Sequence, residues 1–120
     1  MVELNDRASL REGGRSSSDA MNEYILLMHN DATDCAAAQS SEKWGAYLEM
    51  LRQSGQFDGG SSIGQGQTFR QGQAARVAAL DLTGFIRVRA QSLEEAQRFL
   101  TGNPVYEAGG TVQVRELPKE

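Results

Sequence analysis

Hydrophobic and polar positions divide the chain into short strands and two helices. Residues 23–29 read Glu-Tyr-Ile-Leu-Leu-Met-His, so an extended strand here has apolar side chains on both faces. A strand that is apolar on both faces is usually buried on both faces. Residues 84–90 and 110–116 instead alternate apolar and polar side chains, which predicts half-buried strands. Less regular patterns indicate a short strand near 56–62 and a further one within 75–82.

Between these strands, two segments have helical spacing. The first follows Ser40 and Ser41, either of which can cap its first turn, and it ends at Gly55, a residue suited to a left-handed helix end. Its apolar face consists of Trp44, Tyr47, Leu48 and Leu51.

The second helix begins at a capping box, in which Ser92 and Glu95 satisfy each other's free amides. Its predicted apolar stripe is Leu93, Ala96, Phe99 and Leu100, and Gly102 and Pro104 are expected to stop it. Residues 30–40 and 64–73 are expected to be a loop and an exposed turn.

This order of elements predicts an α+β fold of the ferredoxin-like, split βαβ type, with an antiparallel sheet. Two helices cover one face of a four-stranded sheet and leave the other bare. The strand at 23–29 therefore needs a second cover, and a partner's sheet in a symmetric homodimer is the simplest one. Residues 1–20 are polar and aperiodic, so we interpret them as a flexible N-terminal arm before a domain over 21–120, although that arm is the rival cover.

Composition narrows the function classes. The net charge of −4 makes a nucleic-acid partner unlikely, and a single cysteine, Cys35, excludes an intrachain disulfide. No apolar run approaches the roughly 18 residues of a membrane span, so a cytoplasmic location is the default expectation. Gly59 to Gly66 lacks the Lys-Ser/Thr pair of a phosphate-binding loop, so we expect no cofactor there.

Several segments in order resemble the YCII-related family and its DGPF branch. They are Tyr24-Ile25-Leu26-Leu27-Met28, Leu51-Arg52-Gln53-Ser54-Gly55 with Gly59-Gly60, Gly84-Phe85-Ile86-Arg87-Val88, Ser92-Leu93-Glu94-Glu95-Ala96, Asn103-Pro104-Val105-Tyr106 with Gly109, and Val112-Gln113-Val114-Arg115-Glu116-Leu117. The resemblance spans 21–118. It implies a ferredoxin-like protomer that pairs into a dimeric α/β barrel with a cleft near the sheet.

The chain departs from the family's catalytic pattern. Some members carry a histidine on the first helix, where this chain has Trp44 and Gly45, and an Asp-Pro pair, here Asn103-Pro104. The Asp-Gly-Pro-Phe signature is also absent; residues 81–85 read Asp-Leu-Thr-Gly-Phe. Each loss weakens an enzyme interpretation, because fold similarity alone does not give function.

The best catalytic candidates are His29, as a general acid or base, and Asp31, which could orient it. The alternative is a solvent-facing strand end. Cys35 could pair with His29 as a nucleophile, but its alanine neighbours favour a buried or half-buried thiol. A metal site would require His29, Asp31 and Asp34 to converge with Glu49 or Asp58, which the spacing does not support.

Ligand-binding candidates lie in the second half of the chain. Arg87 and Arg89 share a strand face with Phe85 and could bind an anionic small molecule, or only solubilise the sheet. Asn103 and Tyr106 could donate hydrogen bonds to a ligand, or only fix the last helical turn. Two functions stay open: a small-molecule binding protein, with or without cofactor-free catalysis, and a non-catalytic dimerisation or regulatory module.

Overall fold

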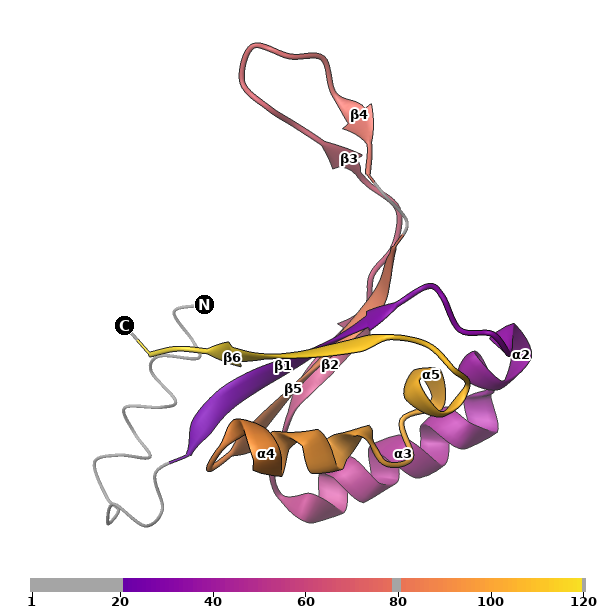
Figure 1. Cartoon of the computed structure of the whole chain (residues 1–120), viewed down its shortest axis with the longest axis vertical. Coiled ribbons are helices and arrows are strands. Elements are labelled where there is room, and N and C mark those ends of the chain that lie inside the picture. Colours follow the sequence, from indigo (N-terminus) through magenta and orange to yellow (C-terminus); the bar gives the residue numbers. More distant parts are fainter. Residues whose placement is uncertain (1–20, 79–80, 120) are drawn as a thin grey trace.

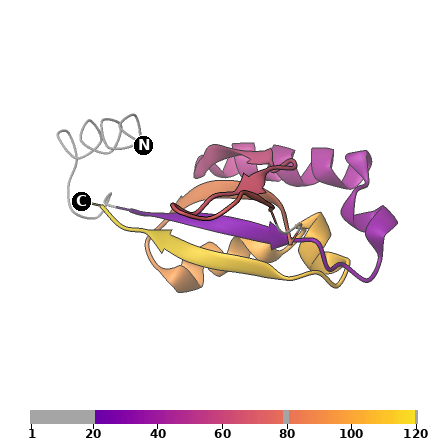
Figure 2. The same ribbon diagram turned by 90° about the horizontal axis from the view of Figure 1, so that it is seen from above.

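The computed structural model describes residues 21–78 and 81–119. Its main sheet has four antiparallel strands in the order β2-β5-β1-β6, which confirms the α+β, ferredoxin-like prediction. The strands are β1 (Asn22–His29), β2 (Phe57–Ser62), β5 (Leu82–Ala90) and β6 (Val112–Leu117). The first and last strands of the domain, β1 and β6, lie side by side (Figures 1 and 2). The predicted N-terminal arm lies outside the described residues.

One face of the sheet, which we call the core face, packs against the helices. From β1 it takes Tyr24, Leu26 and Met28, each at most 3% exposed. Ile86, Val88 and Ala90 of β5 have the same alternation and the same burial. These side chains form one hydrophobic cluster with the helices, as the period-two pattern of the sequence predicts.

The opposite face, which we call the open face, carries the remaining residues of each strand. Ile25 and Leu27 of β1 lie here and are only half-buried. Phe85 of β5 and Gln113 of β6 are paired with Leu27 on either side and are half-buried too. Strand β1 therefore has apolar side chains on both faces, as its sequence predicts. The helices of the chain pack against the core face.

The first long helix, α3 (Ser41–Ser54), follows the sequence prediction closely. The Ser40 hydroxyl accepts a hydrogen bond from the Lys43 amide at 3.3 Å, and Gly55 ends the helix with φ 74°. A positive φ of this size is available to glycine without steric cost. Tyr47 and Leu51 point into the core and are buried.

The loop expected at 30–40 contains one helical turn, α2 (Cys35–Ala38). Asp34 caps this turn, because its Oδ1 accepts a hydrogen bond from the Ala37 amide at 3.1 Å. A single turn is too short to produce a periodic apolar pattern, which is why the sequence does not reveal it.

The second helix differs from its prediction. Only α4 (Leu93–Ala96) is α-helical, and residues 97–100 continue as a 3₁₀ turn. Leu93 is 45% exposed rather than part of the apolar stripe. Ser92 does accept from the Glu95 amide, but Glu95 Oε1 accepts from the Gln91 amide at 2.6 Å instead of that of Ser92.

Pro104 does not merely stop the second helix; it begins another one, α5 (Pro104–Glu107). Asn103 caps this turn, with its Oδ1 accepting from the amides of Val105 and Tyr106 at 3.0 Å each. Proline suits the first helical position because the amide hydrogen it lacks has no partner there in any case.

The exposed turn expected at 64–73 belongs to a projecting hairpin. Strands β3 (Gln67–Thr68) and β4 (Arg76–Val77) form a separate two-stranded sheet that stands away from the main body (Figure 1). The strand predicted within 75–82 is thus reduced to Arg76–Val77, and residues 79–80 lie outside the described part of the chain.

Candidate functional site

A cavity of about 490 Å³ lies between helices α2 and α3 and the adjoining ends of β1, β2 and β5. This volume falls within the roughly 300–1,000 Å³ of typical small-molecule sites. The lining residues are Met28, His29, Asn30, Ala32, Cys35, Ala38, Gln39, Trp44, Leu48, Phe57, Gly60, Ser61, Ser62, Thr83, Gly84, Phe85, Ile86 and Val105.

Small residues help to form the cavity. Ala32 and Ala38 line it from the α2 side, where longer side chains would occupy the space. Gly60 of β2 and Gly84 of β5 line the sheet side. A Cβ at Gly60 would overlap the carbonyl oxygen of Phe85, so the two strands approach this closely only because residue 60 is glycine. The result is a wall on which polar side chains lie beside apolar ones, so it offers both hydrogen bonds and apolar contact.

Trp44 has a fixed place on this wall. Its indole Nε1 donates a hydrogen bond to the Ala38 carbonyl at 2.8 Å, which ties α3 to α2. The indole also makes an edge-to-face contact with the Tyr47 ring, at 5.8 Å between ring centroids. The helical pattern places both rings on the apolar face of α3; Tyr47 is buried, whereas Trp44 is half-buried and lies between core and cavity.

His29 lines the same cavity at the end of β1. Its Nε2 lies 2.8 Å from the Nε2 of Gln113, on the neighbouring strand β6. Because an amide nitrogen donates and does not accept, this contact is a hydrogen bond in the tautomer whose Nε2 carries no proton. Gln113 belongs to the open face, so the imidazole is held towards that face.

Asp31 is oriented by Thr111 rather than by the imidazole. Its Oδ1 accepts from the Thr111 amide at 2.8 Å, and its Oδ2 accepts from the Thr111 hydroxyl at 2.6 Å. These bonds, with a smaller contribution from the charge of His29, lower the pKa of Asp31 below its usual 3.8. The structure therefore brings His29 and Asp31 near each other, each with its own hydrogen-bonding partner.

Cys35 is exposed, which makes the expectation of a buried or half-buried thiol wrong. Its Sγ lies 3.6 Å from the Ala32 carbonyl. The error has a simple reason: the alanines beside Cys35 belong to the single turn α2, of which none is fully buried. Cys35 and His29 both line the cavity, so the structure brings this pair to one site.

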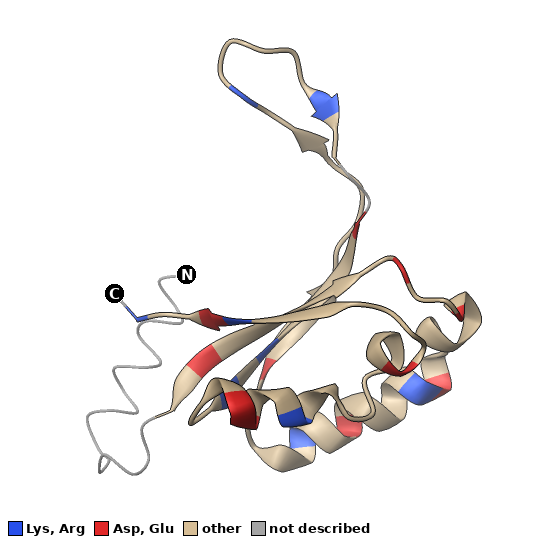
Figure 3. Cartoon of the chain, viewed as in Figure 1, with Lys and Arg blue, Asp and Glu red and all other residues tan. Residues whose placement is uncertain are grey.

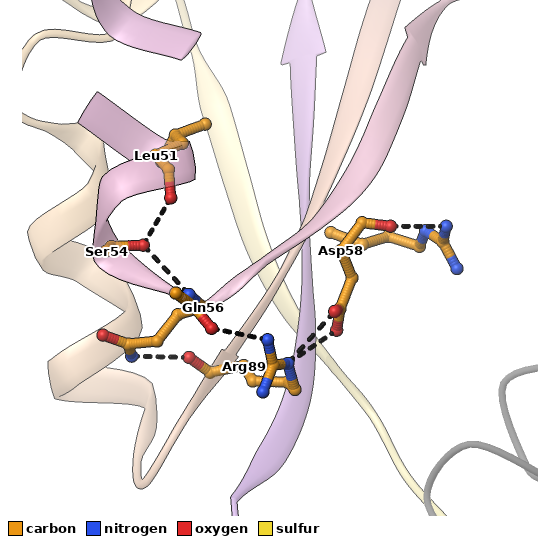
Figure 4. Close-up of polar contacts among 7 residues, drawn as sticks. Leu51, Ser54, Gln56, Asp58 and Arg89 are labelled. Carbon is orange, nitrogen blue, oxygen red and sulfur yellow. Dashed lines mark hydrogen bonds and ion pairs between the residues drawn. The ribbon is translucent and has the colours of Figure 1, made fainter. Parts of the chain in front are cut away.

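The two candidate arginines lie on the open face and do not line the cavity. Arg89 Nε contacts both carboxylate oxygens of Asp58, at 3.0 and 3.1 Å, and its NH2 donates to the Gly55 carbonyl at 2.6 Å. Arg87 NH2 donates to the Asp58 carbonyl at 2.7 Å. Figure 4 shows this network, which fastens the start of β2 to β5. Arg87 Nε is buried and has no partner among the described residues.

Asn103 and Tyr106 lie apart from the cavity. Asn103 is fully buried, with its Oδ1 capping α5 and its Nδ2 facing the Met28 sulfur at 3.6 Å. Tyr106 is 49% exposed. Of the two interpretations left open for Asn103, fixing the last helical turn matches the contacts that the side chain makes.

Sequence reasoning missed Gln113 and Thr111, the residues that hold His29 and Asp31. Both follow β1 by more than 80 positions in the chain, and only the β1–β6 pairing brings them together. The signal that could have found Gln113 is its place, by alternation, on the polar side of the last strand.

Within residues 21–78 and 81–119, no three histidine, cysteine or acidic side chains are grouped as metal ligands would be. The same part of the chain has no helix with the length and apolar content that crossing a bilayer requires.

No curated protein matches the chain. The profile of the YCII-related domain, by contrast, matches residues 21–118, which cover both the sheet and the cavity. The agreement extends over nearly the whole chain and includes every strand and helix described above. The chain therefore belongs to the YCII-related family.

Proposed function

We propose that this protein binds a small molecule, with an apolar body and a few polar groups, in the cavity between α2–α3 and the sheet. The observation that carries the proposal is the wall itself: Trp44, Leu48 and Phe57 provide apolar surface, and Gln39 and Thr83 add polar groups. A site of this composition binds by apolar burial and selects by a few hydrogen bonds. Any cofactor-free catalysis at this site would fall to His29, whose imidazole would have to leave Gln113 to reach a ligand in the cavity.

The protein offers a direct reporter of binding, because Trp44 is its only tryptophan and lines the cavity. A suitable probe for this test is the fluorescent dye 8-anilinonaphthalene-1-sulfonate, whose absorption overlaps tryptophan emission. Titration into the full chain is expected to quench Trp44 and to excite the probe by energy transfer.

A matched pair of variants locates the probe. Ala38→Leu adds three carbon atoms to the cavity wall, whereas Ala36→Leu makes the same change at an exposed position of the same turn, outside the cavity. We expect the probe's dissociation constant to rise at least fivefold in Ala38→Leu and to stay within twofold in Ala36→Leu. Equal affinity in the two variants, or no transfer from Trp44, would exclude the cavity as the binding site.

We further propose that the chain functions as a symmetric homodimer through its open face. Ile25, Leu27 and Phe85 are half-buried there, and apolar side chains grouped on one sheet face favour association. Light scattering should give twice the chain mass of 13.1 kDa. Leu27→Asp should give a monomer, while Leu93→Asp, an equal change on exposed α4, should remain dimeric.

Any anion binding by Arg87 and Arg89 would take place on the open face, outside the cavity. The non-catalytic dimerisation module is the other candidate function. It is favoured by Thr111 and Gln113, which hold Asp31 and His29 in contacts that need no ligand. If the wild-type chain dimerises but the probe fails to discriminate Ala38→Leu from Ala36→Leu, this second candidate is preferred.

A further inference from the structure

Residues 63–78, which we call the ribbon, extend beyond the sheet from the ends of β2 and β5. The ribbon joins the main sheet where the Ile63 amide donates to the Thr83 carbonyl at 2.9 Å. It then projects away from the body, so every residue from 60 to 77 is exposed (Figure 1). An isolated two-stranded ribbon is only marginally stable in water.

The ribbon has one apolar and one cationic face. In its ladder Val77 pairs with Gln67, and Arg76 pairs with Thr68. Phe69 directly follows β3, which ends at Thr68, and continuing the alternation by one residue places its ring on the side of Val77. Phe69 is 74% and Val77 78% exposed, the two largest values among the exposed large hydrophobic residues of the described chain. Two such side chains together on a projecting ribbon indicate a contact surface.

The charges of the ribbon indicate the kind of partner. The segment 59–80 contains Arg70 and Arg76 and no acidic residue (Figure 3). The segment 31–42 is the reverse, with the exposed Asp31, Asp34 and Glu42 and no lysine or arginine. One copy of the chain thus offers the charge that complements the ribbon of another copy.

We propose that the ribbon is a dimerisation arm that contacts a second copy of this chain with both faces: Phe69 and Val77 pack on the partner from one face, and Arg70 and Arg76 meet its acidic segment, residues 31–42, from the other. This inference rests on the homodimer proposed above, and it assigns part of the dimer interface to the ribbon.

The size of a stable interface supports this assignment. Standard interfaces use about 20–30 residues on each side. The strands of the main sheet have 8, 6, 9 and 6 residues, and only alternate ones face the open side. The open face alone is therefore too small, and the exposed ribbon supplies the residues that are missing.

A nucleic acid fits the ribbon less well. Two arginines neutralise at most about two phosphates, and nucleic-acid affinity grows with the number of phosphates neutralised. The net charge of −4 on the chain opposes such binding further.

Sedimentation equilibrium of the full chain tests the arm. We expect Phe69→Ser with Val77→Ser to raise the dimer's dissociation constant at least tenfold. Leu93→Ser removes an exposed apolar side chain, 45% exposed, from α4 and should change the dissociation constant less than twofold. Circular dichroism confirms that each variant is folded.

Photo-crosslinking supplies the second readout. With p-benzoylphenylalanine at position 69, irradiation should give a covalent dimer whose crosslinked peptide comes from the other chain, and the same group at position 93 should give none. If the wild type is dimeric but the ribbon variants dimerise equally well and position 69 does not crosslink, the arm is disproved and the dimer stands.

Two further outcomes would also overturn the inference. A wild-type chain that is monomeric at all concentrations removes both the arm and the proposed dimer. Binding of a 20-base-pair DNA duplex that is lost in Arg70→Gln with Arg76→Gln would assign the ribbon to nucleic acid instead.

Discussion

The core face and the open face of the sheet are formed by alternate residues of the same strands, yet they have different environments. On β1, Leu26 is fully buried against the helices, while its neighbour Leu27 is half-buried on the opposite side. On β5, Val88 is fully buried, while Arg87 and Arg89 on the other face hold the start of β2. Apolar packing thus stabilises one face, and polar bonds between strands contribute to the other.

This difference shows what alternation specifies. The sequence pattern determines which residues share a face, because successive side chains point to opposite sides of a strand. It does not determine what covers each face. The helices of the same chain cover the core face, and the open face is where we propose that a second copy packs.

The largest difference between the faces is expected from truncating adjacent leucines. Leu26→Ala should lower the free energy of unfolding by about 3 kcal/mol, as for other fully buried leucines. Leu27→Ala should lower it by about 1 kcal/mol, since less apolar area is lost. Urea denaturation measures both. Equal losses at low protein concentration would contradict the difference between the two faces. A Leu27→Ala loss that grows with protein concentration would support packing of a second copy on the open face, because dimerisation stabilises the folded chain by mass action.

Alkaline pH should expose the burial of the core face through Tyr47. Burial raises the pKa of this phenol to about 12 from the usual 10.0. Above pH 10 the unfolded state loses the proton while the folded state keeps it, so the free energy of unfolding should fall by about 2 kcal/mol between pH 10 and 12.

The Tyr47→Phe variant isolates this effect. At pH 7 it should be about 1 kcal/mol less stable than the wild type, because the 2.6 Å hydrogen bond to the Phe99 carbonyl is lost. Above pH 10 its stability should decline less steeply, so the two curves should cross between pH 10 and pH 12. If thermal melts gave parallel curves of stability against pH for the wild type and the variant, the raised pKa of Tyr47 would be contradicted.

On the open face the corresponding test is Asp58→Ala. The Asp58 side chain is 8% and the Arg89 side chain 20% exposed, and removal leaves a largely buried guanidinium without its carboxylate. We expect a loss of about 2 kcal/mol in the free energy of unfolding. Glu49→Ala breaks the exposed pair with Arg52, 3.6 Å apart, and should cost under about 0.5 kcal/mol. Similar losses for the two variants would show that the open-face network contributes little.

The smallest effect concerns Asp31, at the edge of the open face. Hydrogen bonds from Thr111 hold the pKa of Asp31 below 3.8, so Thr111→Val should raise it towards that value. Stability from this contact is present above pH 3.8 and is lost as the pH falls through the lowered pKa. A carbonyl-detected NMR titration of the Asp31 side chain measures the change. An unaltered pKa of Asp31 in the variant would mean that the backbone amide of residue 111 lowers this pKa without help from the hydroxyl.

Much of the fold could be predicted from local chemistry. The strand at 23–29, the cap at Ser40 and the end of α3 at Gly55 all depend on residues close together in the sequence, and they are confirmed. Short elements were harder, because a single turn such as α2 or α5 has no period to detect. Pro104 illustrates the ambiguity, because a proline can follow the end of one helix or begin another. The cap that Asn103 provides shows that Pro104 begins α5.

The candidate site depended on contacts between distant residues, which local patterns do not contain. From the sequence alone, His29 and Asp31 are a plausible pair, and Arg87 and Arg89 share a face. Only the tertiary structure shows that Gln113 contacts His29 and that Thr111 donates hydrogen bonds to Asp31. It also shows that Arg89 donates to Asp58 and Gly55. The sequence by itself determined which side chains lie on each face of the sheet, because that is set by the geometry of the extended backbone. The cavity, the projecting ribbon and the partners of each polar group were decided by the pairing of distant strands and helices.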